Sequence, residues 1–190
     1  MSLPLTPSQT IGPFFHRALL TDKGNDLITD GPSGTRIVIE GRVLDGDGQP
    51  VTDAMIEIWQ ANAAGRYEHP ADPQDKPRDD TFHGFGRTAT DQQGRFSFRT
   101  IKPGAVREAG DFTQAPHINV MLFARGLLHH LVTRIYFPGE PLNLSDPVLR
   151  AVPTERRSTL IAEEFRSSNE RHYQFDIVLQ GDIETVFFDI

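Results

Sequence analysis

The chain has 190 residues, enough for one sizeable hydrophobic core in a single domain, and a formal net charge of -7 at pH 7. This negative charge, together with the lack of any long run of Lys or Arg, argues against a nucleic-acid-binding surface and against docking on acidic membranes. Cysteine is absent from the sequence, which excludes disulfides, thiolate metal sites and cysteine nucleophiles.

No apolar run approaches the ~20 residues that a membrane-spanning helix needs. The first residues also lack the basic stretch and long apolar run of a secretory signal, so a cytoplasmic location is expected. The 16 glycines and 14 prolines favour many short strands joined by turns over a helical bundle.

Residues 1–35 show little hydrophobic periodicity. The segment 6–15 contains two prolines and a Gly-Pro step, which favour an extended or turning backbone over a helix. We interpret 1–35 as an N-terminal arm that packs either on its own domain or on another subunit. The remainder, 36–190, is predicted to form one sandwich domain.

Two apolar segments, 36–44 and 54–60, flank the turn residues of 45–50 and predict a pair of strands joined by a turn. Trp59 is expected in the core, because a single large aromatic side chain usually fills interior volume. The polar segment 62–80 is predicted to be a long surface loop, and such loops are often functional.

The segments 85–90 and 95–101 flank a turn signal and predict a hairpin, with Phe96 and Phe98 on one face of its second strand. A further long loop is expected at 102–112. The centre of the fold is expected at 115–137, where two strand-forming runs flank an Arg-Gly turn. On the first of these runs, His117 and Asn119 should face the same side.

The segment 153–165 is the only convincing helix in the sequence, with Thr154 as its expected N-cap. Strict alternation at 172–180 predicts a half-buried strand, and a last strand is expected at 183–190. The pattern as a whole predicts an all-β fold: a β-sandwich of about seven to nine strands with long loops, an N-terminal arm and one short helix.

The chemically useful residues form no recognisable site. None of the seven histidines has a metal-binding spacing such as His-Xaa-His. His117 could be a ligand, but the carboxamide of Asn119 is a weak donor for a transition metal. A ferric ion would favour phenolates, yet Tyr136 and Tyr173 lie in strand patterns and are better explained by packing. Nucleophile-elbow and phosphate-loop motifs are also missing from the sequence. The residues alone therefore indicate a sandwich without a self-sufficient active site.

Several long motifs occur together and in order, in the segments 6–13, 41–67, 86–104, 115–126 and 181–189. Through them, nearly the whole chain resembles the intradiol ring-cleaving dioxygenase family, and within it the α subunits that pair with a homologous β subunit. The resemblance implies a β-sandwich in an obligate, higher-order αβ oligomer, with non-haem Fe(III) bound by the β subunit. It also implies protocatechuate and O₂ as substrates and 3-carboxy-cis,cis-muconate as product, in the β-ketoadipate pathway of aromatic catabolism.

The catalytic chains of this family bind iron through two tyrosines and two histidines. In the present sequence these positions fall on Gln74, Val106, His117 and Asn119, so only one ligand is retained. An arginine that assists catalysis falls near Gln114. The resemblance therefore implies that the chain holds no metal and has no catalytic residue of its own.

The resemblance further implies a contribution to the partner's substrate pocket by Thr10, Gly12 and Pro13 of the arm and by Arg134. A Gly-Pro step lets a rigid backbone approach closely, and the planar guanidinium of arginine suits a carboxylate. For Arg134 the alternative is a salt bridge between subunits.

Two other functions remain open at this point. The chain could be a complete intradiol dioxygenase with substituted ligands, which predicts iron and activity from the chain alone. It could instead be a non-catalytic binding or assembly module of the transthyretin-like kind, with which it shares the strand-turn-strand region 36–60.

Overall fold

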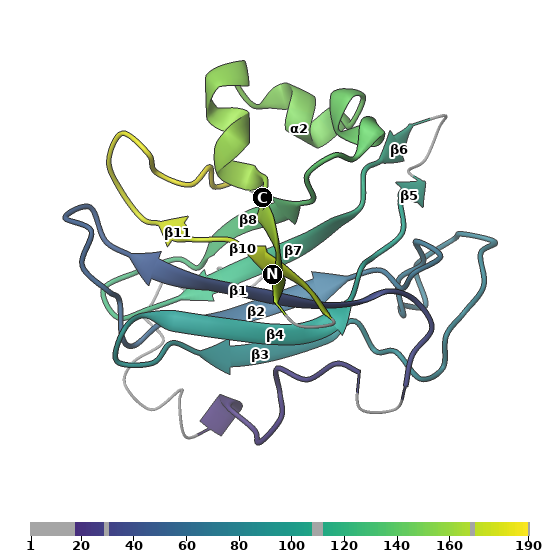
Figure 1. The fold of residues 1–190 in the computed structure, drawn as a ribbon, viewed down its shortest axis with the longest axis horizontal. Helices are drawn as coiled ribbons and strands as arrows, with labels where there is room; N and C mark the ends of the chain where they lie inside the picture. The colour runs from purple at the N-terminus through teal and green to yellow at the C-terminus, as the bar shows by residue number, and fades with distance from the viewer. Residues whose placement is uncertain (1–17, 29–30, 108–111, 168–169, 190) are drawn as a thin grey trace, which may run out of the picture.

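A computed structural model describes residues 18–28, 31–107, 112–167 and 170–189 (Figure 1). Thr10, Gly12 and Pro13 lie outside these described residues, so the predicted role of the arm stays a prediction. None of the helices in the described part of the chain has the length and apolar character needed to cross a membrane.

Two β-sheets face one another and make up most of the molecule (Figure 1). The five strands of the first sheet are β1 (Arg36–Leu44), β4 (Arg95–Ile101), β9 (Glu163–Ser167), β10 (Glu170–Gln174) and β11 (Ile177–Val178). The four strands of the second are β2 (Met55–Gln60), β3 (Phe85–Ala89), β7 (His117–Phe123) and β8 (Leu131–Tyr136). A small third sheet pairs β5 (Val106–Arg107) with β6 (Thr113–Gln114). The predicted all-β sandwich is confirmed.

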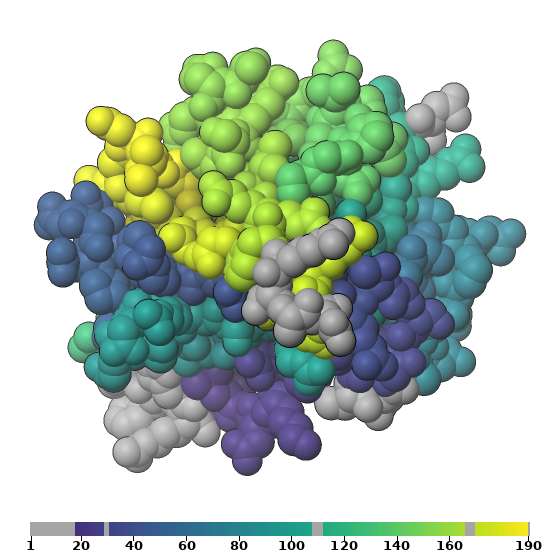
Figure 2. All heavy atoms as spheres, in the orientation of Figure 1, coloured from purple at the N-terminus to yellow at the C-terminus, as the bar shows by residue number. Residues whose placement is uncertain are grey.

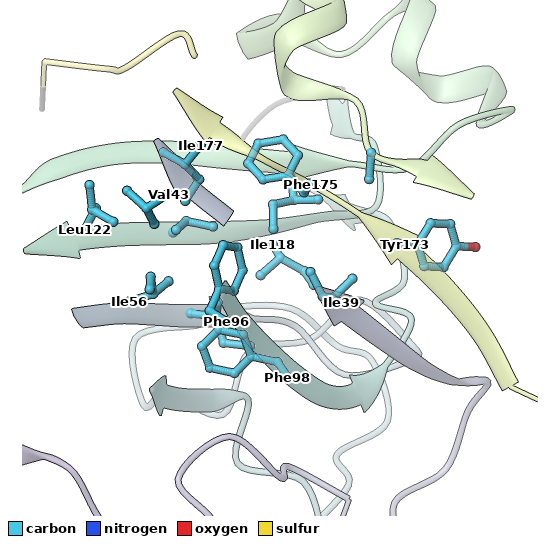
Figure 3. Packing of buried hydrophobic residues seen from close by; sticks show 14 of the residues in the cluster. Ile39, Val43, Ile56, Phe96, Phe98, Ile118, Leu122, Tyr173, Phe175 and Ile177 are labelled. Carbon is cyan, nitrogen blue, oxygen red and sulfur yellow. The ribbon is translucent and has the colours of Figure 1, made fainter. Parts of the chain in front are cut away.

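The core lies between the two sheets and consists of the inward faces of alternating strands. Figure 3 shows Phe96 and Phe98 of β4 beside Ile39 of β1 and facing Ile118 of β7. On β4, buried residues alternate with exposed ones, as the sequence pattern predicts. Removal of these side chains from water is the main force that holds the sheets together.

The predicted hairpin at 85–101 is wrong, whereas the two strands predicted within 36–60 are present but do not pair with each other. β1 and β2 lie in different sheets, as do β3 and β4; β4 pairs antiparallel with β1, and β3 with β2. A turn signal specifies that the chain reverses, but not whether the next strand joins the same sheet or arches over to the facing one.

Trp59 is only partly buried, which corrects its predicted place in the core. Its neighbour Ile58 points inward and is buried, so the alternation of a strand directs Trp59 to the outer face of the second sheet. The adjoining segment 61–84 contains no helix or strand, which confirms the predicted long loop. In the described part of 102–112, the predicted loop is shortened by β5.

The predicted helix over 153–165 is only partly correct. Residues Thr154–Leu160 form a 3₁₀-helix, η2, whose N-cap is Pro153 with no side-chain cap hydrogen bond, and 163–167 belong to β9. A 3₁₀-helix, η1 (Pro141–Leu144), and a short α-helix, α2 (Pro147–Ala151), precede it. In the space-filling view, the segment 141–160 is green and covers the top of the molecule (Figure 2).

Of the strand predicted at 183–190, the described residues contribute only an isolated bridge between Phe188 and Val132. By contrast, the predicted half-buried strand after residue 170 is present as β10 and β11. The two predicted central strands are β7 and β8, which pair antiparallel with His117 opposite Tyr136 and Asn119 opposite Arg134.

Candidate functional site

The candidate site lies on the outer face of the four-stranded sheet, at one end of β7 and β8. Ile118 and Val120 of β7 point into the core, so His117 and Asn119 project from the opposite face, as predicted. We use the name polar cluster for the side chains gathered at this point: Tyr67, Gln114, His117, Asn119, Arg134, Tyr136 and Asp146.

Tyr67 enters the polar cluster from the long loop. Its ring stacks on Trp59, with centroids 5.7 Å apart and planes 19° apart. Its hydroxyl oxygen lies 3.2 Å from Nε2 of His117 and 3.1 Å from Nδ2 of Asn119. The side chain that contacts both His117 and Asn119 is therefore a tyrosine 50 residues before His117 in the chain.

The hydrogen bonds around His117 define its tautomer. Nδ1 is 2.7 Å from the carbonyl oxygen of Ala115, and a carbonyl can only accept, so the ring proton is on Nδ1. Nε2 is then an acceptor, and the hydroxyl of Tyr67 donates to it. Asn119 in turn donates from Nδ2 to the oxygen of Tyr67 and to the carbonyl oxygen of Trp59.

Burial decides the protonation states of this part of the cluster. It lowers the pKa of His117 to about 4, and the positive charge of Arg134 acts in the same direction. Burial also raises the pKa of Tyr67, so its phenol stays protonated at neutral pH. His117 is thus a neutral imidazole bonded to a neutral phenol.

The other half of the cluster is anchored on Asp146, a fully buried carboxylate. Asp146 accepts hydrogen bonds from the backbone N–H groups of Ala115 and Leu149, each at 2.8 Å, and from the hydroxyl of Tyr136 at 3.0 Å. Through the contact with Leu149 it caps α2. Burial raises the pKa of Tyr136, which stays a neutral donor. Tyr136 and Tyr173 are both buried, which confirms their predicted packing roles.

Arg134 lies within this chain's own polar cluster. Its Nη1 atom donates to Oε1 of Gln114 at 2.9 Å and lies 3.5 Å from the hydroxyl of Tyr136. Among the described residues its hydrogen-bond partners are neutral, and no carboxylate there forms an ion pair with it. The guanidinium thus sits beside Gln114, the position near which the catalytic chains carry their arginine. Its predicted reach into a partner's pocket stays a prediction.

The two positions expected for tyrosine ligands, Gln74 in the long loop and Val106 in β5, belong to segments joined by a hydrogen bond. Oε1 of Gln74 accepts a hydrogen bond from the backbone N–H of Arg107, the residue after Val106, at 3.0 Å. A carboxamide and an isopropyl group therefore stand where two phenolates would be needed. On the loop side of Tyr67, a hollow of about 410 Å³ is lined by Asn62, Arg66 and Phe82, among others.

The donor set does not fit Fe(III). Gln74 and Val106 supply no anionic oxygen, and both ring nitrogens of His117 are engaged in hydrogen bonds within the protein. Within the described residues, no group of three or more His, Cys, Asp and Glu side chains is placed to hold a metal ion. Gln74, Val106 and Asn119 therefore offer none of the anionic or imidazole donors that a ferric ion favours.

Comparisons with known proteins identify the family. The family sequence model described as "Dioxygenase" matches residues 10–181. Over its whole length the chain is 43% identical to the protocatechuate 3,4-dioxygenase alpha chain of Burkholderia cepacia, of which it covers 99%. It is 42% identical, over 94% of its length, to the beta chain from the same organism, of which it covers 77%. The chain belongs to the intradiol ring-cleaving dioxygenase family.

Solved structures of intradiol dioxygenases share the fold. The dioxygenase domain of a carbohydrate-binding fusion protein from Streptomyces sp. SirexAA-E is 28% identical with a TM-score of 0.64, over 95% of this chain and 99% of that one. The intradiol ring-cleavage dioxygenase from Tetranychus urticae, at 18% identity and a TM-score of 0.64 over 93% of this chain, supports the fold alone.

Sequence reasoning found His117 and Asn119 but missed Tyr67 and Asp146. Tyr67 lies in a loop without periodicity, and the only signal was its place in the shared motif 41–67. Asp146 directly precedes a Pro at the first helical position, which is an N-cap signal that could have been read.

Proposed function

We propose that the chain is the non-iron-binding α subunit of a protocatechuate 3,4-dioxygenase. In this proposal it acts with a homologous β subunit, which holds Fe(III), to cleave protocatechuate with O₂ to 3-carboxy-cis,cis-muconate. The role of this chain is to provide scaffold and pocket wall within an αβ oligomer. The iron on the β subunit would supply the activation of the catechol.

The observation that carries the proposal is the chemistry of the ligand positions. Overall identity does not separate the two subunit types, because the chain is 43% identical to one α chain and 42% identical to one β chain. Gln74, Val106 and Asn119 do separate them, since a chain with these side chains cannot supply two phenolates and a second imidazole. An intact sandwich with a degenerate ligand set supports a partner-dependent subunit.

The two other functions are less well supported. A self-sufficient dioxygenase needs a ferric site, which the described donor set does not offer. A transthyretin-like module would need only the two sheets. It would not need the long loop, nor the polar cluster to which the loop contributes Tyr67.

The test is to purify the chain alone and together with a candidate β subunit, and to measure iron content, visible absorption and protocatechuate cleavage for each. We expect a colourless, iron-free and inactive lone chain that joins a coloured, active complex. A lone chain that is coloured and active would overturn the proposal in favour of a complete enzyme. A lone chain that forms no complex with any β subunit would favour the binding module.

The pocket-wall role has its own test in the complex. The arm residues Thr10, Gly12 and Pro13 and the guanidinium of Arg134 are the proposed contributions. Arg134→Ala should raise KM or lower kcat for protocatechuate while the iron content of the complex stays unchanged. Arg36→Ala, at the start of β1 in the other sheet, is the control and should leave both constants unchanged. Kinetics of the Arg134 variant equal to those of the parent would refute this assignment.

A further inference from the structure

Lysine occurs only at positions 23, 76 and 102 of this chain, and Lys76 has an unusual environment. Its ammonium nitrogen lies 2.6 Å from the carbonyl oxygen of Ala105 and 3.4 Å from that of Gly65. One of these carbonyls belongs to the 61–84 loop and the other to the 102–107 segment. The ammonium therefore bridges the two segments that carry ligand positions 74 and 106.

The two segments touch at the backbone where Lys76 lies. A Cβ atom placed on Gly65, whose φ is +82°, would be 1.9 Å from the carbonyl oxygen of Ala105 and 2.8 Å from Nζ of Lys76. Only glycine permits this approach. Further hydrogen bonds join the segments on either side, from Gly104 N to Asn62 O at 2.9 Å and from Arg107 N to Gln74 Oε1 at 3.0 Å.

The same contacts lead to Tyr67. The guanidinium of Arg66 donates to the carbonyl oxygen of Lys76 at 2.7 Å, which ties Lys76 to the residue before Tyr67. Asp72 accepts the backbone N–H of Tyr67 at 2.7 Å and that of Gln74 at 2.9 Å. Burial lowers the pKa of Lys76, and the carboxylate of Asp72 opposes this shift. A substitution at Lys76 is therefore expected to shift the position of the Tyr67 hydroxyl.

We propose that Lys76 is a positioning residue that replaces a metal cross-link: its ammonium ties the 61–84 loop to the 102–107 segment and thereby holds Tyr67 against His117. An ammonium ion held by two carbonyl dipoles can do this because, like a metal ion, it draws oxygen atoms of separate segments to one point charge. The inference does not depend on the proposed function, since every contact lies within the chain.

Lys76→Met tests the proposal, because it keeps an unbranched apolar side chain while removing the charge and the donors. In the full chain, we expect backbone hydrogen exchange in 62–80 and 102–107 to become about tenfold faster, with that of β7 unchanged. Lys23→Met, at an exposed position, is the matched control and should change neither segment. Equal exchange in the two variants would overturn the proposal.

A further measurement separates positioning from general packing. Lys76→Arg keeps charge and donors and should restore slow exchange to within about twofold of the parent. An arginine variant as labile as Lys76→Met would refute the assignment. If Lys76→Met does not fold, Lys76→Gln serves for the same measurements.

Discussion

The hydroxyl of Tyr67 donates to Nε2 of His117 across 3.2 Å and accepts from Asn119 across 3.1 Å. One neutral phenol thus hydrogen-bonds the side chains at two positions that the sequence predicts to correspond to ligands of the catalytic chains. With Nδ1 of His117 bonded to Ala115, this half of the polar cluster is closed by the protein's own atoms. Its stability should therefore depend on hydrogen bonds and not on a bound ion.

Removal of the Tyr67 hydroxyl should be costly. Tyr67→Phe leaves the buried Nε2 of His117 without a donor, so we expect the free energy of unfolding to fall by about 1–3 kcal/mol in urea denaturation. Tyr173→Phe is the control, because the hydroxyl of Tyr173 makes no hydrogen bond with the described residues and points away from the core neighbours labelled in Figure 3. Equal losses in the two variants would contradict the role given to Tyr67.

Stability should fall in mild acid because of His117. Its folded-state pKa of about 4 lies below the ordinary 6.5, so the unfolded chain takes up the proton first and the stabilisation, complete above pH 6.5, is lost as the pH falls toward 4. The loss from this group should reach about 2 kcal/mol by pH 5. Urea denaturation of the parent and of His117→Gln between pH 7.5 and 5 measures the contribution of His117 to this loss. Parallel pH profiles of the two proteins would show that His117 is not the cause.

Asp146 should be the most sensitive polar residue of the cluster. Asp146→Ala removes the acceptor of two backbone N–H groups and of the Tyr136 hydroxyl in a site with no exposure, and we expect a loss of about 3–5 kcal/mol in the free energy of unfolding. Asp45→Ala is the matched control, since Asp45 also accepts two backbone N–H groups but in an exposed turn. Asp45→Ala should cost about 1 kcal/mol. Similar losses would mean that burial does not amplify the effect.

Ferric ion should not stabilise the isolated chain. A ligand that binds only the folded state raises the unfolding temperature according to its affinity, and the described residues offer no group of donors for such binding. Differential scanning calorimetry of the lone chain with and without excess ferric citrate should give the same Tm. The complex with the β subunit, measured before and after iron chelation, is the positive control. A rise of several degrees in the lone chain would contradict the donor-set argument.

The sequence by itself determined the features that depend on neighbouring residues. Strict alternation specified which face of β4, β7 and β10 is buried, and it placed His117 and Asn119 on one side of a central strand. Motif order specified the family. The side chains at 74, 106 and 119 predict that ferric ligands are missing, and this stays a prediction. These inferences need only strand geometry and donor chemistry, which are local.

Only the tertiary structure decided which strands pair and which distant residues contact each other. Turn signals predicted a hairpin at 85–101 and a turn between the two strands of 36–60. The chain arches between sheets at both places, because a reversal is compatible with either pairing and packing of the two apolar faces chooses between them. Three hydrogen bonds of the site and its surroundings join residues far apart in the sequence. The separations are 50 residues for Tyr67 and His117, 31 residues for Asp146 and Ala115, and 29 residues for Lys76 and Ala105. Such contacts come from loops without periodicity, so no local pattern encodes them, and they appear only when the folded sheets bring the loops together.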